Sequence, residues 1–241
     1  MSKISLIFYW VFFAVLNLKA SEYEITVLAT NTANFGGIGE WSFSALLESD
    51  DEKILFDTGF NENTVLHNAN LLGKDLSQVE KVILSHFHGD HTGGLIKLRK
   101  TFKEINPKAF STVYVADGFF EQRYDENGEL RGFIGGFNDV DNFLKETDDL
   151  GIRFVILKEP IEISKNLYLS GPVERIHERV VVSPGFYLKK DGLLLDDLVL
   201  DDQSLGILTK QGWYMMSGCG HAGMINTCLL YTSDAADDKQ C

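Results

Sequence analysis

The chain is organised around one stretch, Ser85-His86-Phe87-His88-Gly89-Asp90-His91-Thr92-Gly93-Gly94. It directly follows the apolar run Lys81-Val82-Ile83-Leu84 and places three imidazoles and one carboxylate close together. That run predicts a short buried strand that ends where the polar residues begin. Several side chains that can coordinate a metal therefore leave one strand end together, which predicts one cation site or two.

Spacing divides the candidate ligands into two pairs. His86 and His88 are two positions apart, so they leave on the same side if the alternation of the strand continues. Two adjacent imidazoles suit a borderline cation such as zinc. Asp90 and His91 lie on the following turn, where Gly89 allows the backbone to tighten, and they can face a second cation beside the first. The alternative is a histidine-rich surface turn without metal.

Three further motifs accompany this stretch. Leu55-Phe56-Asp57-Thr58-Gly59 lies upstream, while Asp201-Asp202-Gln203-Ser204-Leu205 and then Ser217-Gly218-Cys219-Gly220-His221-Ala222-Gly223 lie downstream. With His86-x-His88-x-Asp90-His91 they resemble the signature of the metallo-β-lactamase superfamily of metal-dependent hydrolases. The Asp-Asp-Gln and Gly-Cys-x-His-Ala-Gly forms resemble a subgroup often labelled dihydropterin-(ribofuranosyl)aminobenzene phosphate synthase-like. The resemblance covers residues 24–227.

This resemblance implies an α/β fold of the four-layer αβ/βα sandwich type, truncated at its C-terminus. His221 follows a predicted strand and is expected to complete a three-imidazole site with His86 and His88. Asp57 is expected just behind the ligands, where it accepts a hydrogen bond from an imidazole or from the turn, with turn capping as its alternative role. Members of the superfamily normally supply another histidine for the second metal, and no histidine follows His221.

The implied reaction is hydrolysis by a metal-activated hydroxide. Metal at His86, His88 and His221 lowers the pKa of water and supplies a nucleophile without serine or cysteine. Asp90, with His91 on the second metal, is expected to orient that hydroxide and to carry a proton to the leaving group. The expected cofactors are two divalent ions, zinc first, with manganese or iron as alternatives. The expected partner is a small molecule with an ester, lactone, amide or phosphoester bond.

Two other functions stay open at this point. The subgroup resemblance implies a pterin-condensing transferase, in which the metals hold a pyrophosphate leaving group. A catalytically inactive extracellular binding domain is the third hypothesis, because the second metal site lacks a ligand.

Residues 119–137 mix aromatic side chains with glycines, which is unusual for a long helix or a solvated loop. The mixture predicts a lid over the metal pocket, where Phe119, Phe120 and Tyr124 contact a flat or apolar substrate. The alternative is a loop that packs on the hydrophobic core and has no contact with substrate.

Four other side chains have two interpretations each. Arg175 or Arg179 could bind an anionic group of the substrate, although a solvated charged loop explains both. Cys219 could lie near the metals, but packing of a small buried residue is the favoured interpretation. His67 falls within a predicted helix and is interpreted as solvent-facing rather than as a ligand.

The first residues predict export. Lys3 precedes a mainly apolar run over residues 4–16, and Ala20 precedes a polar chain. This pattern predicts a signal peptide over residues 1–20 and a secreted or periplasmic location, with an uncleaved membrane anchor as the alternative. No stable membrane association is expected once the signal is cleaved. The net charge of −13 argues against nucleic acid as a partner.

The last residues resemble a non-native tail. From Cys228 the chain reads Cys-Leu-Leu-Tyr-Thr-Ser-Asp-Ala-Ala-Asp-Asp, which resembles the translation of an adapter used in sequencing libraries. The interpretation divides the chain into a signal peptide (1–20), one domain (21–227) and a non-native tail (228–241). A genuine acidic tail is the alternative. Neither case supports a disulfide framework.

Apolar patterns predict the elements of the domain. Short successive strands favour an antiparallel sheet near the start, and alternation of strands with helices places helices outside sheets. The expected strands cover residues 24–28, 41–47, 53–56, 81–84, 112–115, 152–157, 167–170, 204–208 and 213–217. The expected helices cover residues 63–72, 95–102 and 139–150.

Overall fold

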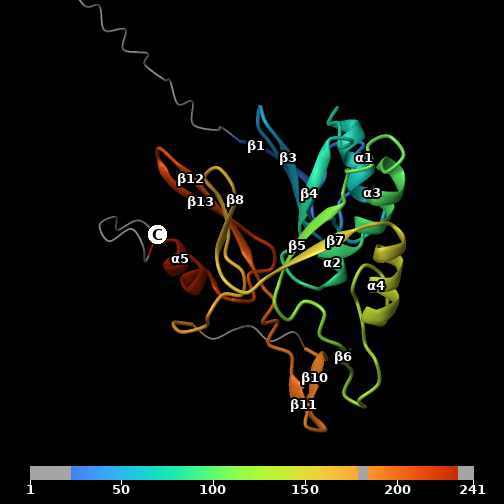
Figure 1. Cartoon of the computed structure of the whole chain (residues 1–241), viewed down its shortest axis with the longest axis vertical. Coiled ribbons are helices and arrows are strands. Elements are labelled where there is room, and N and C mark those ends of the chain that lie inside the picture. Colours follow the sequence, from blue (N-terminus) through green and yellow to red (C-terminus); the bar gives the residue numbers. More distant parts are fainter. Residues whose placement is uncertain (1–22, 179–183, 233–241) are drawn as a thin grey trace, which may run out of the picture.

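The computed structural model describes residues 23–178 and 184–232. The expected signal peptide, Arg179 and residues 233–241 of the expected tail lie outside the described residues. Two sheets face each other, and helices cover their outer faces (Figure 1). This order of layers confirms the predicted α/β sandwich. Within the part of the chain that is described, no helix combines the length and the apolar character needed to cross a bilayer.

The larger sheet has the strand order β1-β2-β3-β4-β5-β7. Its first three strands pair antiparallel, as predicted, whereas β3, β4, β5 and β7 pair parallel. Parallel pairing follows because a helix returns the chain between successive strands of this half. The strands are β1 (Glu24–Ala29), β2 (Ser44–Glu48), β3 (Lys53–Phe56), β4 (Val79–Ile83), β5 (Thr112–Ala116) and β7 (Arg153–Leu157).

Helices cover the outer face of this sheet (Figure 1). The larger apolar core lies between them and includes buried helix residues such as Val65, Leu98 and Phe143. The start of the helix predicted over residues 139–150 is confirmed, because the carboxylate of Asp139 caps it by accepting a hydrogen bond from the backbone N–H of Asn142 at 2.8 Å. The helices are α1 (Thr64–Leu71), the short α2 (Gly89–Thr92), α3 (Leu95–Phe102) and α4 (Val140–Asp149).

The second sheet has the order β13-β12-β9-β8, and an inter-sheet core packs it against the first. On its outer face lies α5 (Met224–Thr232), where Tyr231 contacts the Trp213 ring and donates a hydrogen bond to the Ser204 carbonyl at 2.8 Å. Helix α5 therefore continues past Thr227, the residue at which the sequence analysis ended the domain. The strands are β8 (Ile161–Ser164), β9 (Leu167–Leu169), β12 (Ser204–Thr209) and β13 (Gly212–Ser217).

A third, small sheet projects below the sandwich (Figure 1). Its order is β11-β10-β6, with β6 (Arg123–Tyr124), β10 (Tyr187–Lys190) and β11 (Leu193–Asp196). The sequence analysis did not predict this sheet: β6 lies in the expected lid segment, β10 lies at the end of a segment interpreted as a charged loop, and no element was assigned to β11. It pairs residues of the expected lid with a distant hairpin.

The loop that precedes β2 is fixed by side chains of its neighbours. The strand predicted over residues 41–47 begins only at Ser44, and Trp41 is exposed in the loop. The Asn68 side chain donates to the carbonyls of Leu28 and Ile38 at 2.7 and 2.8 Å and accepts from the Ile38 N–H at 2.8 Å. The loop is therefore held against helix α1.

Asn68→Ala is expected to destabilise the fold by about 2–4 kcal/mol, because it leaves buried backbone groups of the loop without partners. Asn70→Ala is the matched control, since Asn70 is exposed on the same helix and gains the same helix propensity. Chemical denaturation of both variants measures the difference. Equal stability of the two variants would contradict this account of the loop.

Candidate metal centre

The histidine-rich turn begins where β4 ends. His86 and His91 are buried and His88 is 8% exposed, and α2 starts directly after His88 and carries Asp90 and His91. Gly89 is required at this point, because a Cβ there would lie 2.6 Å from the carbonyl oxygen of Phe133. The sheet edge and the packed turn thus direct the imidazoles to one side.

Three imidazoles from two distant segments converge. His86 Nε2 lies 2.8 Å from His88 Nδ1, and the ring of His221 lies 4.8 Å from that of His86 and 5.1 Å from that of His88 between centroids. Ligand atoms of all three lie within 4.8 Å of one another. The structure therefore brings together the three residues that the sequence analysis assigned to the first cation.

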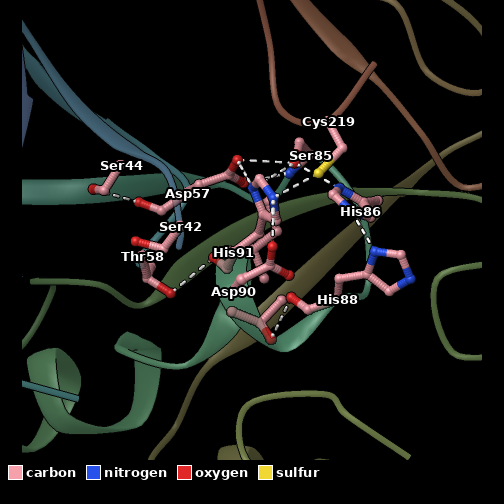
Figure 2. A network of polar contacts seen from close by, with 12 residues as sticks. Ser42, Ser44, Asp57, Thr58, Ser85, His86, His88, Asp90, His91 and Cys219 are labelled. Atoms are coloured by element: carbon pink, nitrogen blue, oxygen red, sulfur yellow. Dashed lines mark hydrogen bonds and ion pairs between the residues drawn. The ribbon is translucent and has the colours of Figure 1, made fainter. Parts of the chain in front are cut away.

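Hydrogen bonds behind these rings fix their orientation (Figure 2). Asp57 accepts from the backbone N–H and the hydroxyl of Ser85 at 2.7 and 2.8 Å and from His91 Nδ1 at 2.6 Å. Because the Ser85 hydroxyl donates to Asp57, its oxygen accepts from His86 Nδ1 at 2.9 Å. His86 Nε2 is then the unprotonated nitrogen that faces His88. Asp57 lies at the position predicted for it, behind the histidine side chains, and it adopts a φ of 55° there.

The burial of the cluster controls its charge. Burial lowers the pKa of His86 well below its ordinary value and that of His88 to about 3, and the neighbouring imidazoles act in the same direction. Burial also opposes charge on His91, but the charge and the hydrogen bond of Asp57 raise the pKa of His91 well above its usual range. Burial raises the pKa of Asp90. His86 and His88 are thus neutral, which is the form that coordinates metals.

A second group of donors lies beside the first. His91 Nε2 is 3.2 Å from Cys219 Sγ and 3.5 Å from Asp90 Oδ2. Ligand atoms of His86, His91 and Cys219 also lie within 4.8 Å of one another. Cys219 is exposed, so the interpretation of it as a buried packing residue is wrong.

The Asp-Asp-Gln motif ties the two segments of the centre together. Asp201 accepts from the backbone N–H of Phe87 at 2.8 Å, and Asp202 accepts from that of Ala222 at 2.7 Å. Gln203 donates its side chain to the carbonyl of Leu84 at 2.8 Å. Burial raises the pKa of Asp202 to about 7. These buried side chains position both histidine-bearing turns, a role that the sequence analysis did not assign to them.

The donor set fits a divalent cation. Two nitrogens bound to one tetrahedral ion at about 2.0–2.1 Å lie roughly 3.4 Å apart, so the contact between His86 and His88 has only to open by about 0.6 Å. The hydrogen-bonded orientation of His86 points its unprotonated nitrogen into the cluster. The centre is therefore a histidine cluster able to hold a divalent metal.

An open cavity of about 600 Å³ lies next to this cluster. His88 and Asp90 line it together with an exposed arginine and several aromatic rings. The remaining lining residues are Trp41, Phe60, Arg131, Gly132, Phe133, Asn138 and Phe186. A substrate in this cavity would meet the metal-binding residues at one end.

The residues predicted to contact substrate do not line this cavity. Phe119 is 1% exposed in the core and packs against Phe120, which corresponds to the packed alternative for this part of the segment. Tyr124 lies in β6 beneath Lys189, and Arg175 donates to the carbonyl of Val199. These side chains serve packing and backbone contacts instead.

Other aromatic residues form the cavity walls. Trp41 and Phe60 come from loops that follow or precede strands of the larger sheet, and Phe133 comes from the expected lid segment. Glu40 fixes two of these loops, because its carboxylate accepts from the Phe60 N–H and the Thr64 hydroxyl, both at 2.8 Å. The available sequence signal was the presence of these aromatic residues in segments that also contain glycines.

Comparison with known proteins places the chain in a family. The sequence profile of the Metallo-beta-lactamase superfamily matches residues 42–224. The 7,8-dihydropterin-6-methyl-4-(beta-D-ribofuranosyl)-aminobenzene-5'-phosphate synthase of Methanocaldococcus jannaschii is 30% identical over 219 residues, which cover 86% of this chain and 71% of that protein. The anti-Pycsar protein Apyc1 of Paenibacillus sp. (strain J14) is 32% identical over 131 residues, covering 52% and 47%.

A solved structure agrees with these sequence matches. The crystal structure of a metal-dependent hydrolase of the beta-lactamase superfamily superposes with a TM-score of 0.67 at 27% identity, covering 91% of this chain and 73% of that one. The chain therefore belongs to the metallo-beta-lactamase superfamily.

Proposed function

We propose that this protein is a metal-dependent hydrolase that cleaves an ester, lactone, amide or phosphoester bond of a small molecule. One observation carries the proposal: the coordinating atoms of His86, His88 and His221 converge beside an open cavity of about 600 Å³. A cluster of imidazoles, two of them buried, next to a substrate-sized cavity is the arrangement that metal-assisted hydrolysis requires.

The chain's own residues have distinct tasks in this reaction. When bound, a divalent cation would polarise the scissile group and lower the pKa of water to about 7. Asp90 lines the cavity beside His88, so its carboxylate can orient the attacking water and pass a proton to the leaving group. Asp57 holds His91 in one orientation through the 2.6 Å contact at Nδ1.

The cavity favours a substrate with a flat ring and an anionic group. Trp41 and Phe60 are 77% and 48% exposed, so their faces are available for stacking. The Arg131 guanidinium lies 4.7 Å from the centroid of the Phe186 ring and donates to the carbonyl of Gly185. It is thereby held at the cavity, where it can pair with a carboxylate or a phosphate.

We assign two divalent ions to the active protein, zinc before manganese or iron. Imidazole suits zinc and iron, and the additional donors around His91 offer a second position. Elemental analysis of protein purified without chelators would determine both the number and the kind of ion.

Pterin condensation is the second candidate function. The similarity to the synthase of Methanocaldococcus jannaschii favours it, as does the aromatic cavity, which suits a flat ring. A predicted signal peptide argues against it, because pterin synthesis is cytoplasmic chemistry. The two candidates differ in product, since condensation releases pyrophosphate and hydrolysis consumes water.

Asp90→Asn is expected to lower kcat about 10²–10⁴-fold in hydrolysis of a responsive substrate, because it removes the carboxylate that accepts the proton. A panel of chromogenic esters, lactones, amides and phosphodiesters, assayed with the metal-loaded protein, identifies that substrate. The measurement is product release at saturating substrate with metal content determined in parallel.

Asp149→Asn is the control, because Asp149 is an exposed residue near the end of α4 that pairs only with Lys145 among the ion pairs described. It should retain full activity. Release of pyrophosphate from a pterin substrate, with no hydrolysis of any panel member, would replace the hydrolase proposal with the transferase. Native protein without metal would favour a binding domain.

A further inference from the structure

His221 lies in a tight turn between β13 and α5. The Gly223 N–H donates to the carbonyl of Gly220 at 3.0 Å, which closes a β-turn. His221 and Ala222 are the two central residues of this turn. Ala222 is fully buried, so both of its backbone polar groups need partners inside the protein. Its N–H donates to the carboxylate of Asp202 at 2.7 Å, which leaves its carbonyl to be satisfied by another group.

The side chain of Asn226 binds that carbonyl. Asn226 is 4% exposed in the first turn of α5, and its Nδ2 donates to the Ala222 carbonyl at 2.8 Å. Its Oδ1 accepts from the backbone N–H groups of Ile176 and His177 at 3.0 and 2.7 Å. Because both of these groups are donors, the oxygen of the amide faces them and the nitrogen faces Ala222. One side chain therefore joins the His221 turn to residues 176–178.

Glu178 fixes the start of the same helix. Gly223 precedes α5 and has no side chain to cap it, and a Cβ there would overlap the carboxylate of Glu178. Glu178 Oε1 instead accepts from the N–H of Ile225 at 2.7 Å. A carboxylate at this end of a helix satisfies a backbone donor and interacts favourably with the helix dipole. Residues 176–178 thus hold α5, and with it Asn226, against the turn.

We propose that Asn226 is a positioning residue of the metal centre, which holds the backbone next to His221 and thereby sets the affinity for the ion bound by the three imidazoles. The proposal rests on the proposed metal-dependent function. Asp202 fixes the peptide group between His221 and Ala222, and Asn226 fixes the peptide group that follows. Without the amide, the buried carbonyl of Ala222 has no partner, so the turn shifts and moves the His221 ring away from the other two.

Titration of the metal-free full-length protein with Zn²⁺, in competition with a chromogenic chelator, tests the proposal. Asn226→Ala removes the amide without adding charge and suits a helix. Asn226→Asp keeps acceptors for Ile176 and His177 but removes the donor that faces Ala222. Both variants should bind the first equivalent about 10–100-fold more weakly, the usual effect of losing a group that orients a metal ligand. The negative charge of Asn226→Asp attracts cations, so its charge cannot explain weaker binding.

Two kinds of control separate positioning from general stability. Asn70→Ala and Asn70→Asp make the same changes at an exposed residue of α1 and should bind Zn²⁺ as wild type does. Tyr231→Phe removes the hydrogen bond from α5 to the Ser204 carbonyl, which is a different anchor of the same helix. It should lower the melting temperature and leave the affinity for Zn²⁺ unchanged. With Co²⁺ as the probe, the visible absorption bands should change in both Asn226 variants and in none of the controls.

The outcomes distinguish this proposal from the proposed function. Wild-type affinity and an unchanged Co²⁺ spectrum in both Asn226 variants overturn the positioning role, even if the variants melt at lower temperature. Equal weakening by Tyr231→Phe also overturns it, because docking of α5 as a whole would then hold the turn. Both results leave the hydrolase proposal standing. Wild-type protein that binds no ion overturns the metal-dependent function itself.

Discussion

His221→Ala is expected to lower kcat/KM for hydrolysis at least about 10⁴-fold, because it removes one of three donors that hold the cation next to the cavity. His221 reaches the centre from far along the chain, and its ring lies 4.8 Å from that of His86. Without it, the first site keeps two imidazoles. A two-donor site loses the ion at ordinary concentrations, and the pKa of water returns toward its value in bulk.

The fold should survive this substitution. The turn that carries His221 is anchored through its backbone, since the Ala222 N–H donates to the buried carboxylate of Asp202 at 2.7 Å. The His221 ring itself is only partly buried. Elemental analysis should therefore show loss of metal from a protein whose circular dichroism and melting temperature match those of metal-free wild type.

His67→Ala is the matched control, because His67 is an exposed histidine of α1 that contacts the carbonyl of Gly36 at 2.8 Å. It should retain its metal and its activity. Wild-type activity in His221→Ala, with the metal still bound, would show that the three imidazoles do not share a cation.

The local sequence was sufficient to predict that the imidazoles of the histidine-rich turn lie close together. His86, His88 and His91 lie close together along the chain directly after a buried strand, so few conformations could keep them apart. His221 required a family resemblance, because nothing in its own neighbourhood reveals which distant strand it will face. The structure brings it to the other two.

The residues that line the cavity could not be predicted from the local sequence in this way. Phe119 and Phe133 belong to the same aromatic, glycine-bearing segment, yet Phe119 is buried in the core and Phe133 lines the cavity. Composition does not distinguish them, because the difference depends on where β6 pairs with the distant strand β10. Long-range pairing of this kind leaves no local pattern.

Cys219 shows a similar limit. A small residue between glycines is compatible with burial or with exposure, and statistics favour burial for cysteine. Its exposure follows from the close contact of Gly218 with Ser85, a contact between segments more than a hundred residues apart. Only the tertiary structure specifies it.

A network of buried charged side chains contacts the histidine-rich turn. Arg123 is 3% exposed and pairs with two fully buried carboxylates, that of Asp197 at 3.0 Å and that of Asp201 at 2.9 Å. Its guanidinium also lies 3.7 Å from the centroid of the Phe87 ring. Asp201 in turn accepts from the Phe87 N–H, so this network reaches into the histidine-rich turn.

Arg123→Met should therefore destabilise the protein by about 3–5 kcal/mol, because it leaves two carboxylates buried without their cation. For a domain of this size the melting temperature should fall by roughly 6–20 °C. Burial already raises the pKa of Asp201, and the charge of Arg123 opposes that rise, so the substitution moves the pKa of Asp201 still higher. Thermal and chemical denaturation measure the loss.

Two comparisons separate charge from shape in this prediction. Arg153→Met alters an exposed arginine of β7 and should change stability by no more than about 0.5 kcal/mol. Arg123→Met/Asp197→Asn removes one of the stranded charges, so it should be more stable than Arg123→Met alone. If the double variant were the less stable of the two, the stranded charge of Asp197 would not be the source of the loss in Arg123→Met.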